Sequence, residues 1–377
     1  MNLRKVRAIA RKEYYHLIRD FRSLYLAFII PLLLILLFGY ALSLDVEDIE
    51  TVVVDHDRTP QSRDFIRRLD ASAYFNVIDH PADTAGAVAY LDRNRAILAV
   101  VIPPHWSADL KADRKSPLQV IIDGSDPNFA GSARAYVTAY IASANQKQLL
   151  EFLNRQGLKK LKTPVEGRIR VWFNEDLESR NFIVPGIIAI IIMIVGALLT
   201  SLVIAREYEN GTMETIRSLP VRPAEFLLGK ALPYFFIGLI DVLVAVLMGQ
   251  LLFGVVMKSS FWLMLAASAI YLGVALSLGL LISNLTKSQL VANQMAILVT
   301  YLPSLLLSNF VFPYENMPAV LKAITFAVPA TYFIDILNGL YLRNLALIQL
   351  WPSYLVLVLM FCLLAALNLI SLKREGL

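Results

Sequence analysis

Cysteine is almost absent from this chain. Cys362 is the only one among 377 residues, so no disulfide can form within the chain. It lies inside an apolar run near the C-terminus, far from the long polar stretch at residues 45–180. That stretch must therefore be held together by packing, or by pairing with a second copy.

Charged residues are also scarce. They make up 17% of the chain, against 57% hydrophobic residues and a mean hydropathy of +0.59. This is more apolar surface than one soluble core of this length buries, so the composition predicts an integral membrane protein. The net charge of +5 does not indicate a nucleic-acid partner, because the Lys and Arg residues are grouped at the ends of apolar runs.

Residue groups typical of catalysis or metal binding are missing as well. The histidines of the polar stretch stand far apart and have no CxxC partners, so they do not indicate zinc. Its clustered carboxylates follow strand-like segments, where turn and helix-cap duties are the usual roles. These residues are His56, His80, His105, Asp55, Asp57, Asp123 and Asp126. We expect no catalytic residue and no metal site.

A nucleotide-binding P-loop is missing too. The nearest sequence is Gly229-Lys230, but Ala224 occupies the position of the first glycine and Ala231 that of the Ser or Thr that binds magnesium. We therefore expect no cofactor in this chain and no ATP hydrolysis by it.

Long apolar runs are what the sequence does contain. Six of them approach the ~20 residues that an α-helix needs to cross a bilayer. They are residues 24–44, 182–205, 231–254, 261–283, 290–312 and 350–372. The first run has an alternative as a cleaved signal peptide, because Ala41-Leu42-Ser43 offers small residues where signal peptidase prefers them. It exceeds the ~7 to 15 residues of a signal sequence, which favours an uncleaved anchor.

The basic residues orient these spans. With the N-terminus in the cytoplasm, the short cytoplasmic segments hold fourteen Lys and Arg residues, and the short opposite loops hold three. The positive-inside rule therefore predicts that both termini, residues 1–23 and 373–377, are cytoplasmic.

Residues 45–180 then lie outside the cytoplasm and read as an inserted α/β domain. Strand-like runs at 51–54, 74–78, 96–102 and 118–122 alternate with helix-like stretches such as 84–95. A long helix is predicted over 128–155, and a last strand over 168–173. The expected fold is an α-helical membrane protein with six transmembrane helices and this α/β extracytoplasmic domain between helices 1 and 2.

Four polar residues are predicted at membrane depth and mark a candidate pathway. Asp241 lies near the middle of the third span, where a charge costs roughly 2.5 to 3.5 kcal/mol and needs a partner, a cavity or a proton. A proton relay and a structural hydrogen bond both stay open for it. The amides Asn293, Gln294 and Asn309 lie in the fifth span, where bonds between helices are the more frequent role.

Residues 206–230 form a charged segment between two spans. Gly211 is expected to end the preceding helix, Thr212 to cap a short new one, and Leu219-Pro220 to stop it before Pro223 starts the next. The result is a short stiff rod along the membrane face.

Residues 1–23 are expected to form an amphipathic helix in the interface. Ala10, Tyr14, Leu17 and Phe21 recur at helical spacing, opposite basic residues that include Arg11 and Lys12.

The order of one span, a large domain and five spans resembles the permease of an ABC-2 type exporter, as do three groups of residues. These are Arg206-Glu207-Tyr208-Glu209 with Gly211-Thr212-Met213-Glu214, Leu219-Pro220 with Leu228-Gly229-Lys230, and Lys12-Glu13 with Arg19-Asp20. The likeness is strongest to the drug-efflux branch with a periplasmic domain. It implies that residues 206–230 hold the coupling helix that docks on a separate ATPase. The coupling residues carried over are Arg206, Glu207, Glu209, Gly211, Thr212, Glu214 and Pro220, and Glu13 and Asp20 are candidate contacts on the N-terminal helix.

The resemblance also implies partners and a location. A six-span permease pairs with a second copy or a paralogue, and ATP and magnesium are bound by the ATPase subunit. Similar exporters pass substrates to a periplasmic membrane-fusion adaptor and an outer-membrane channel. The chain would be a multi-pass protein of a bacterial inner membrane.

Residues 313–343 are apolar but interrupted by prolines, which predicts a re-entrant helical hairpin. In the family such an element closes the outer end of the pathway, so Pro313 and Pro329 are candidate outer-gate residues.

The cargo is expected to be hydrophobic or amphipathic. Sodium export by an ABC-2 relative stays open, as does an ion-coupled transporter that uses Asp241. A membrane-anchored receptor or adaptor fits less well, because it needs only one or two spans.

Overall fold

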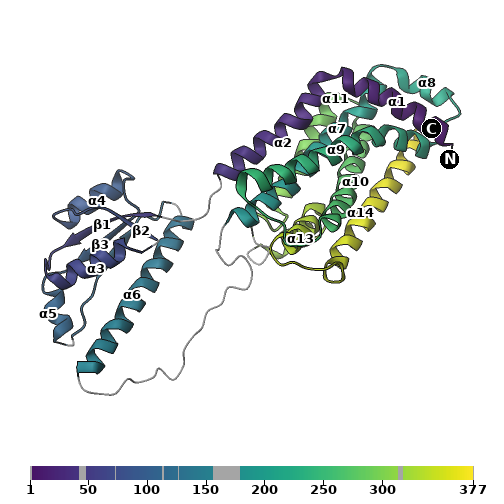
Figure 1. The fold of residues 1–377 in the computed structure, drawn as a ribbon. Coiled ribbons are helices and arrows are strands. Elements are labelled where there is room, and N and C mark those ends of the chain that lie inside the picture. Colours follow the sequence, from purple (N-terminus) through teal and green to yellow (C-terminus); the bar gives the residue numbers. More distant parts are fainter. Residues whose placement is uncertain are drawn as a thin grey trace. The chain divides into compact units, whose positions relative to one another are not determined.

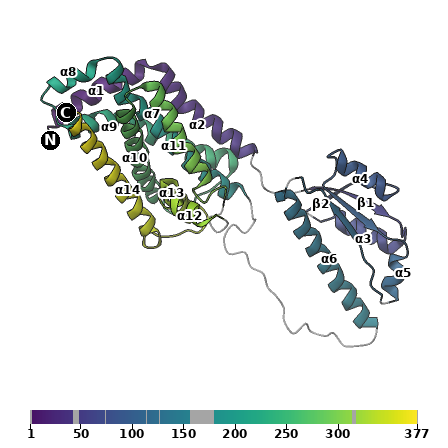
Figure 2. The same cartoon turned by 180° about the vertical axis from the view of Figure 1, so that it is seen from behind.

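The structure, a computed structural model, describes residues 2–41, 48–72, 74–112, 114–125, 127–155, 179–312 and 317–376. It divides into two compact units (Figures 1 and 2). Unit 1 comprises Met1–Ser43 and Val171–Leu377, and unit 2 comprises Leu44–Arg170. Each unit is described by itself.

Unit 1 is helical throughout its described part. Its helices are α1 (Leu3–Arg19), α2 (Phe21–Ala41), α7 (Arg180–Glu209), α8 (Thr212–Ser218), α9 (Pro223–Phe253), α10 (Phe261–Thr286), α11 (Gln289–Leu306), α12 (Ala319–Thr325), α13 (Pro329–Tyr341) and α14 (Leu347–Arg374). The start of α1, the end of α14 and the short α8 lie together at one end of the bundle (Figure 1).

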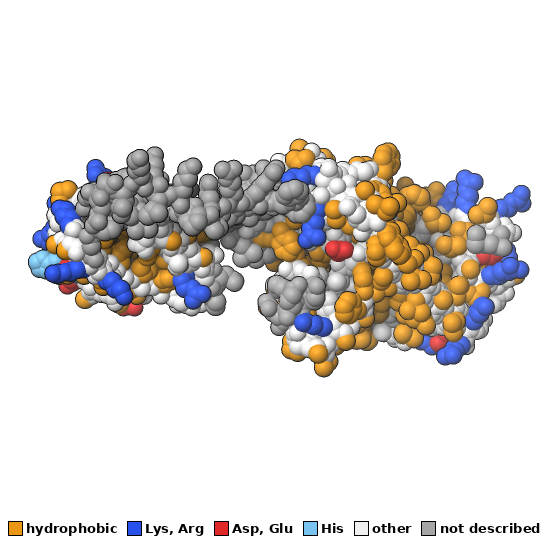
Figure 3. Space-filling model, turned by 90° about the horizontal axis from the view of Figure 1, so that it is seen from below, with side chains coloured by type: hydrophobic (Ala, Val, Ile, Leu, Met, Phe, Trp, Pro, Cys, Tyr) orange, Lys and Arg blue, Asp and Glu red, His pale blue; other side chains and the backbone are white. Residues whose placement is uncertain are grey.

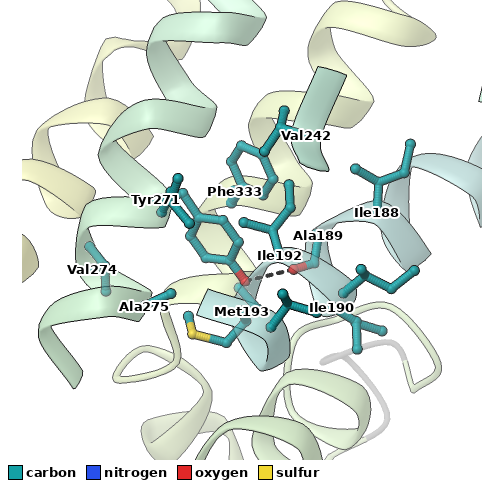
Figure 4. Close-up of a cluster of buried hydrophobic side chains, with 14 of the residues drawn as sticks. Ile188, Ala189, Ile190, Ile192, Met193, Val242, Tyr271, Val274, Ala275 and Phe333 are labelled. Carbon is teal, nitrogen blue, oxygen red and sulfur yellow. Dashed lines mark hydrogen bonds between the residues drawn. The ribbon is translucent and has the colours of Figure 1, made fainter. Parts of the chain in front are cut away.

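Helix α7 is the centre of unit 1. It is apolar on all sides from Phe182 to Ala205, and a helix of that kind is stable only when surrounded. It packs against α2, α9, α10, α11 and α13. Tyr271 of α10 illustrates this packing: its ring stacks on Phe333 of α13 at 4.2 Å. Its buried hydroxyl donates a hydrogen bond to the Ala189 carbonyl of α7 at 3.1 Å (Figure 4).

Five helices of the described chain are long and apolar enough to cross a membrane: α7, α9, α10, α11 and α14. The pair α12 and α13 passes the same test together but is bent by 75°, as a broken span or a re-entrant segment is. Helix α2 covers most of the first predicted span. Hydrophobic side chains spread over the middle of unit 1, and Lys and Arg gather toward one end (Figure 3). The chain is a mostly helical membrane protein with five to six candidate spans.

Two predicted spans have bounds that differ from those of the corresponding helices. Helix α9 begins at Pro223, eight residues before the predicted span, because Glu225 in its first turn accepts the Arg222 backbone N–H at 3.2 Å. Helix α11 ends at Leu306, six residues before the predicted end at 312. Asn309, beyond that end, has a left-handed backbone with φ of 63°.

The N-terminal helix α1 buries a face that matches the predicted apolar side only in part, since Leu17 is buried as expected. Val6, Glu13 and Leu17 are its buried residues, whereas Tyr14 is 53% exposed. The buried face packs on α9, where Gly229 permits close approach: a Cβ at Gly229 would lie 2.7 Å from the Ile9 Cβ.

Unit 2 is built on a four-stranded sheet. Its strands β1 (Ile49–Asp55), β2 (Phe75–Asp79), β3 (Leu98–Ile102) and β4 (Gln119–Ile122) have the order β2-β1-β3-β4. The first three are parallel, with Val53 of β1 opposite Val100 of β3, and β4 is antiparallel to β3. Strand β3 is apolar and buried at every position, as a central strand covered on both faces is.

Helices cover both faces of this sheet. Val53 and Val100 pack with residues of α3 (Pro60–Asp70), α5 (Trp106–Lys111) and α6 (Pro127–Arg155). Val52 and Val101 face the other way, toward Ala87 of α4 (Thr84–Asp92). The predicted strand at 168–173 lies outside the described residues.

Asp57 ties two loops of unit 2 together. Its Oδ2 accepts from the Ser107 hydroxyl, from the Ser107 N–H at 3.2 Å and from the Thr59 hydroxyl at 2.7 Å. Burial raises the pKa of Asp57, but these hydrogen bonds outweigh it and leave the pKa below its ordinary value. The loop after β1 is thus fixed to the start of α5.

The crossing of α7 and α10 gives a test of the packing. A Cβ at Gly279 would overlap the Thr200 hydroxyl and the Ala197 carbonyl oxygen. We expect Gly279→Ala to lower the free energy of unfolding of the detergent-purified protein by about 1–3 kcal/mol, since overpacking forces the helices apart. Chemical denaturation followed by circular dichroism measures it. Gly131→Ala is the control, because a Cβ there meets open space; equal stability of the two variants would refute the close crossing.

Candidate functional site

The last turn of α7 is the candidate site. Its four residues Arg206, Glu207, Tyr208 and Glu209 follow one another on a helix with about 3.6 residues per turn, so their side chains point in different directions. Arg206 and Glu209 lie nearly a full turn apart, and both form hydrogen bonds with Gln289. Glu207 and Tyr208 reach other residues, and together the four contact most of the elements at this end of unit 1.

Arg206 connects α7 to the junction of α1 and α2. Its Nη2 lies 3.2 Å from the Asp20 Oδ2, and its Nη1 lies 3.3 Å from the His16 ring Nε2. Its Nε also donates to the Gln289 Oε1 at 3.4 Å. The side chains of Arg206 and Asp20 are 17% and 25% exposed.

Glu207 lies in a buried ionic cluster with Lys230 of α9, Glu13 of α1 and Lys12 of α1. Lys230 Nζ forms ion pairs with both carboxylates, and Lys12 Nζ lies 2.6 Å from the Glu207 Oε1. The Tyr234 hydroxyl donates to the Glu13 Oε2 at 3.4 Å. We call these four charged residues the ionic lock.

Three of the four charged residues of the ionic lock are buried, so their charges must stay paired. The side chains of Lys230 and Glu13 are each 2% exposed, and that of Glu207 is 6% exposed, whereas Lys12 is half exposed. An unpaired ion in such a place is very unfavourable, so Lys230 requires its carboxylates and they require it. The lock therefore fixes α1, α7 and α9 in one relative position.

Tyr208 connects α7 to the C-terminal tail. Its hydroxyl donates to the Glu375 Oε2 at 3.4 Å and to the Asn284 Oδ1 at 3.5 Å. Glu375 also pairs with Arg217 of α8 at 3.1 Å and with Lys287 at 2.7 Å. The hydrogen bond from Lys287 and the charges of Lys287 and Arg217 lower the pKa of Glu375. This second group joins α7, α8, α10 and the chain end.

Glu209 holds the start of α11. It accepts the Gln289 backbone N–H at 2.8 Å and the Gln289 side-chain amide at 2.5 Å. These hydrogen bonds lower the pKa of Glu209.

Helix α8 follows directly as the predicted short rod. Gly211 permits the turn between α7 and α8 with a left-handed φ of 69°. Thr212 does not cap α8 as expected, because its hydroxyl donates to the Glu207 carboxylate instead. Leu219 is the C-cap, and the Pro220 carbonyl after it accepts from Lys5 of α1.

The two faces of α8 differ. Met213 is 2% exposed and packs, with Ile216, into the core of unit 1. Glu214, Thr215 and Ser218 are exposed on the other side. Leu219, at 52% exposure, and Pro220 extend this outer surface, which we call the α8 face.

The residues predicted for coupling thus divide into two sets. Glu209, Gly211, Thr212, Glu214 and Pro220 are exposed, whereas Arg206 is partly buried and Glu207 is buried. The interpretation of Glu13 as a docking contact needs correction, since its carboxylate is buried against Lys230. Asp20 is only a quarter exposed and pairs with Arg206.

The predicted pathway residues do not come together with this site. Asp241 of α9 is 7% exposed, and its Oδ2 has no hydrogen-bond partner among the described residues. Asn293 is partly buried and Gln294 exposed on α11, whereas Asn309 follows the end of that helix. Pro329 begins α13, and Pro313 lies outside the described residues. A gating role for Pro329 stays a prediction.

Sequence reasoning missed Lys230, Gln289 and Glu375. Lys230 was considered as part of a failed P-loop and of the Leu228-Gly229-Lys230 motif, but not as a buried ion, although a lysine at the start of an apolar run needs an acidic partner if the helix is buried. The adjacent opposite charges Lys12-Glu13 were a signal for that partner. Nothing in the sequence pointed to Glu375.

Comparison with known proteins gives a consistent family. Residues 21–370 match the family model described as ABC-2 family transporter protein. The chain is 34% identical to the probable multidrug ABC transporter permease YbhS of Escherichia coli strain K12, over 100% of this chain and 98% of that protein. It is 29% identical to the probable multidrug ABC transporter permease YbhR of the same strain, over 92% of each chain. It is 28% identical to the inner membrane transport permease YhhJ of that strain, over 72% of this chain and 71% of that protein.

The ionic lock predicts a large effect of removing Lys230. We expect Lys230→Met to lower the free energy of unfolding by about 3–5 kcal/mol, because two buried carboxylates lose their counter-charge. Lys12→Met should cost only about 0–1 kcal/mol, since Lys12 is half exposed. Denaturation of both variants in detergent gives the comparison.

Adding Glu13→Gln and Glu207→Gln to Lys230→Met should restore part of the lost stability, because no buried charge is then unpaired. A loss for Lys230→Met no larger than that for Lys12→Met would contradict the lock.

Proposed function

The chain belongs to the ABC-2 family of transporter proteins, and we propose from this that it is the membrane-spanning permease subunit of an ATP-driven exporter. In this proposal ATP and Mg²⁺ bind to a separate ATPase subunit, which docks on the α8 face. The observation that carries the proposal is the construction of α8, whose outer side is exposed and whose inner side is bound to the membrane helices.

The contacts of α8 suit the transmission of force. The helix is only seven residues long and lies between α7 and α9, the two longest helices of unit 1. Arg217 pairs with Glu375 on its inner side, and Thr212 bonds Glu207 of the lock. A partner that moved the α8 face would therefore move α7 and α9 with it. Such transmission needs elements that shift as rigid bodies, which packed and ion-paired helices do.

A second copy of the chain, or a paralogue, is proposed as the other half of the pathway. Unit 1 leaves one side of α11 uncovered, with Leu290 70% exposed and Leu298 54% exposed. Five to six candidate spans are few for an enclosed path. Two copies that pair about a two-fold axis, the commonest arrangement of homo-oligomers, would enclose one between them. The adaptor and outer-membrane channel stay predictions.

The basic residues of unit 1 support one orientation of the chain in the membrane. Lys5, Lys12 and Arg206 lie at the same end of unit 1 as α8, and the positive-inside rule assigns that end to the cytoplasm. Unit 2 would then lie outside the cytoplasm.

For the cargo we propose a hydrophobic or amphipathic molecule. YbhS and YbhR, the relatives named above, are both described as probable multidrug permeases. A pocket lined by Leu298, Leu302, Phe312 and Leu321 adds an apolar surface beside the bent pair α12 and α13.

An ion-coupled transporter is the second candidate, favoured by one observation. Asp241 lies in a predicted span, is nearly buried and has a carboxylate oxygen without a hydrogen-bond partner among the described residues. Ionisable residues in such places often carry protons or ions.

The docking surface is tested by charge reversal. We expect Glu214→Arg to abolish copurification of an ATPase subunit with the tagged chain, because the side chain is exposed on the α8 face and a reversed charge opposes the partner's contacts. Mass spectrometry of the copurifying proteins and their ATPase activity are the measurements.

Asp92→Arg is the matched control, an exposed acid reversed on unit 2 at the end of α4, where a positive charge is tolerated. An ATPase recovered equally with Glu214→Arg and with wild type would remove α8 as the docking element. Recovery of no ATPase even with wild type would remove the proposed function.

The energy source is tested at Asp241. In inverted membrane vesicles that contain the ATPase, we expect transport to require ATP and to continue in Asp241→Asn, which keeps the shape of the side chain and removes its charge. Transport of a fluorescent amphipathic dye, followed with ATP or with a proton gradient alone, distinguishes the two candidates. Gradient-driven transport that Asp241→Asn abolishes would establish ion coupling instead.

A further inference from the structure

A pocket of about 780 Å³ lies in unit 2, apart from every element proposed for coupling. Two loops and one helix form it: the loop after β1, the first turns of α3, and the loop after β2. It is lined by Asp55, Arg58, Pro60, Arg63, Ile66, Arg67, His80, Pro81 and Ala82. A volume of this size suits a small molecule.

The pocket lies at the carboxyl edge of the sheet, beside β1 and β2. Strands β1 and β2 are parallel neighbours, and Asp55 and Asp79 end them at the same edge. In open α/β sheets ligands bind outside the carboxyl ends of the strands, at the point where the strand order reverses. In the order β2-β1-β3-β4 that point lies between β1 and β3, so this pocket shares the carboxyl edge of the sheet but not the reversal. Asp55 and His80 of the lining belong to this edge.

The charges in the pocket are unbalanced. Three guanidinium groups face it, from Arg58, Arg63 and Arg67, against the single carboxylate of Asp55. Within the described chain, no carboxylate lies within ion-pair distance of Arg58 or Arg63, and Arg67 reaches only the exposed Asp64 at 3.5 Å. Arg58 and Arg63 can therefore form ion pairs with a bound anion.

Asp55 forms no ion pair with them among the described residues, and its oxygens instead accept hydrogen bonds from neighbouring neutral groups. Its Oδ1 accepts the backbone N–H groups of Asp57 at 3.1 Å and Arg58 at 2.9 Å, and its Oδ2 accepts the Ser62 hydroxyl at 2.7 Å. These bonds hold Arg58 in a left-handed conformation with φ of 51°. Such conformations persist where surrounding contacts impose them and are frequent at ligand sites.

Apart from His80, the rest of the lining is apolar. Ile66 is 8% exposed, and Pro60 and Pro81 add rigid hydrocarbon surface. Helix α3 is fixed at its start by a reciprocal bond between Thr59 and Ser62, so the wall that carries Arg63 and Arg67 is well anchored. Guanidinium groups beside a rigid apolar wall match a ligand with an anionic group and a compact apolar body.

We propose that this pocket binds a small amphipathic anion, with its carboxylate or sulfonate held by Arg58 and Arg63 and its apolar part against Ile66 and Pro60. This binding does not depend on export or on an ATPase. The proposal can therefore be tested independently of the proposed function.

The test uses the full-length chain in nanodiscs without ATP. The probe is 2-naphthoate, a rigid apolar body with one carboxylate, and its uncharged isostere 2-naphthamide is the comparison. Isothermal titration calorimetry, corrected with empty nanodiscs, should show saturable binding of the carboxylate and at least roughly tenfold weaker binding of the amide, since bonds to a charged group are lost.

Arg58→Asn with Arg63→Gln should weaken 2-naphthoate binding at least roughly tenfold. Asparagine tolerates the left-handed backbone at position 58, and glutamine is a good helix former, so folding is preserved. Arg93→Gln with Arg95→Gln is the matched control: both arginines are exposed in unit 2 outside the pocket, and the charge removed is equal. Absence of saturable binding, equal binding of the amide, or equal loss in both double variants would each overturn the proposal.

Discussion

The pairing of one buried ammonium group with two carboxylates is the constraint on which unit 1 depends. Lys230 lies between Glu13 and Glu207, and all three are almost without solvent. Outside this arrangement each charge would either be solvated or be strongly destabilised. Ion pairs of this kind add little net stability compared with apolar packing, but they discriminate sharply against other arrangements of the helices. The ion pairs therefore select one position of α1 on α9 and disfavour the others.

This specificity explains why a chain with few charged residues has several of them at the end of α7. The residues Arg206 to Glu209 bind α1, α9, the C-terminal tail and α11, and α8 begins three residues later. Charged side chains that face inward position the helices, and those that face outward on α8 remain available to a partner. One short segment thus serves both purposes, since neighbouring residues on a helix point in different directions.

The sequence predicts the parts of this molecule that depend on local patterns. Apolar runs located the spans, and Gly211, Leu219-Pro220 and Pro223 marked the ends of α7, α8 and the start of α9 as the structure has them. The resemblance to ABC-2 permeases, drawn from these motifs, agrees with the family that the comparisons show. The strand-like run at 96–102 likewise contains the strand β3, Leu98–Ile102.

The parts that depend on distant contacts were not predictable in this way. Glu13 meets Lys230 across 217 positions of the chain, and no local pattern specifies such a pair. Hydropathy placed the start of the third span at residue 231 because Lys230 is charged, although the helix continues through it once the charge is paired. Spacing placed Tyr14 and Leu17 together on the apolar side of α1, whereas packing buries Glu13 with Leu17 and leaves Tyr14 exposed.

The separation of the lock's members along the chain also imposes an order on biosynthesis. Lys12 leaves the ribosome 195 residues before Glu207, and the whole of unit 2 is made between them. During that interval the neighbouring opposite charges of Lys12 and Glu13 have no partner on α7 or α9 and can remain hydrated. Only when α9 emerges does Glu13 acquire its counter-charge. The packing of α1 on α9 is therefore completed late in assembly, although α1 precedes α9 by about two hundred residues in the chain.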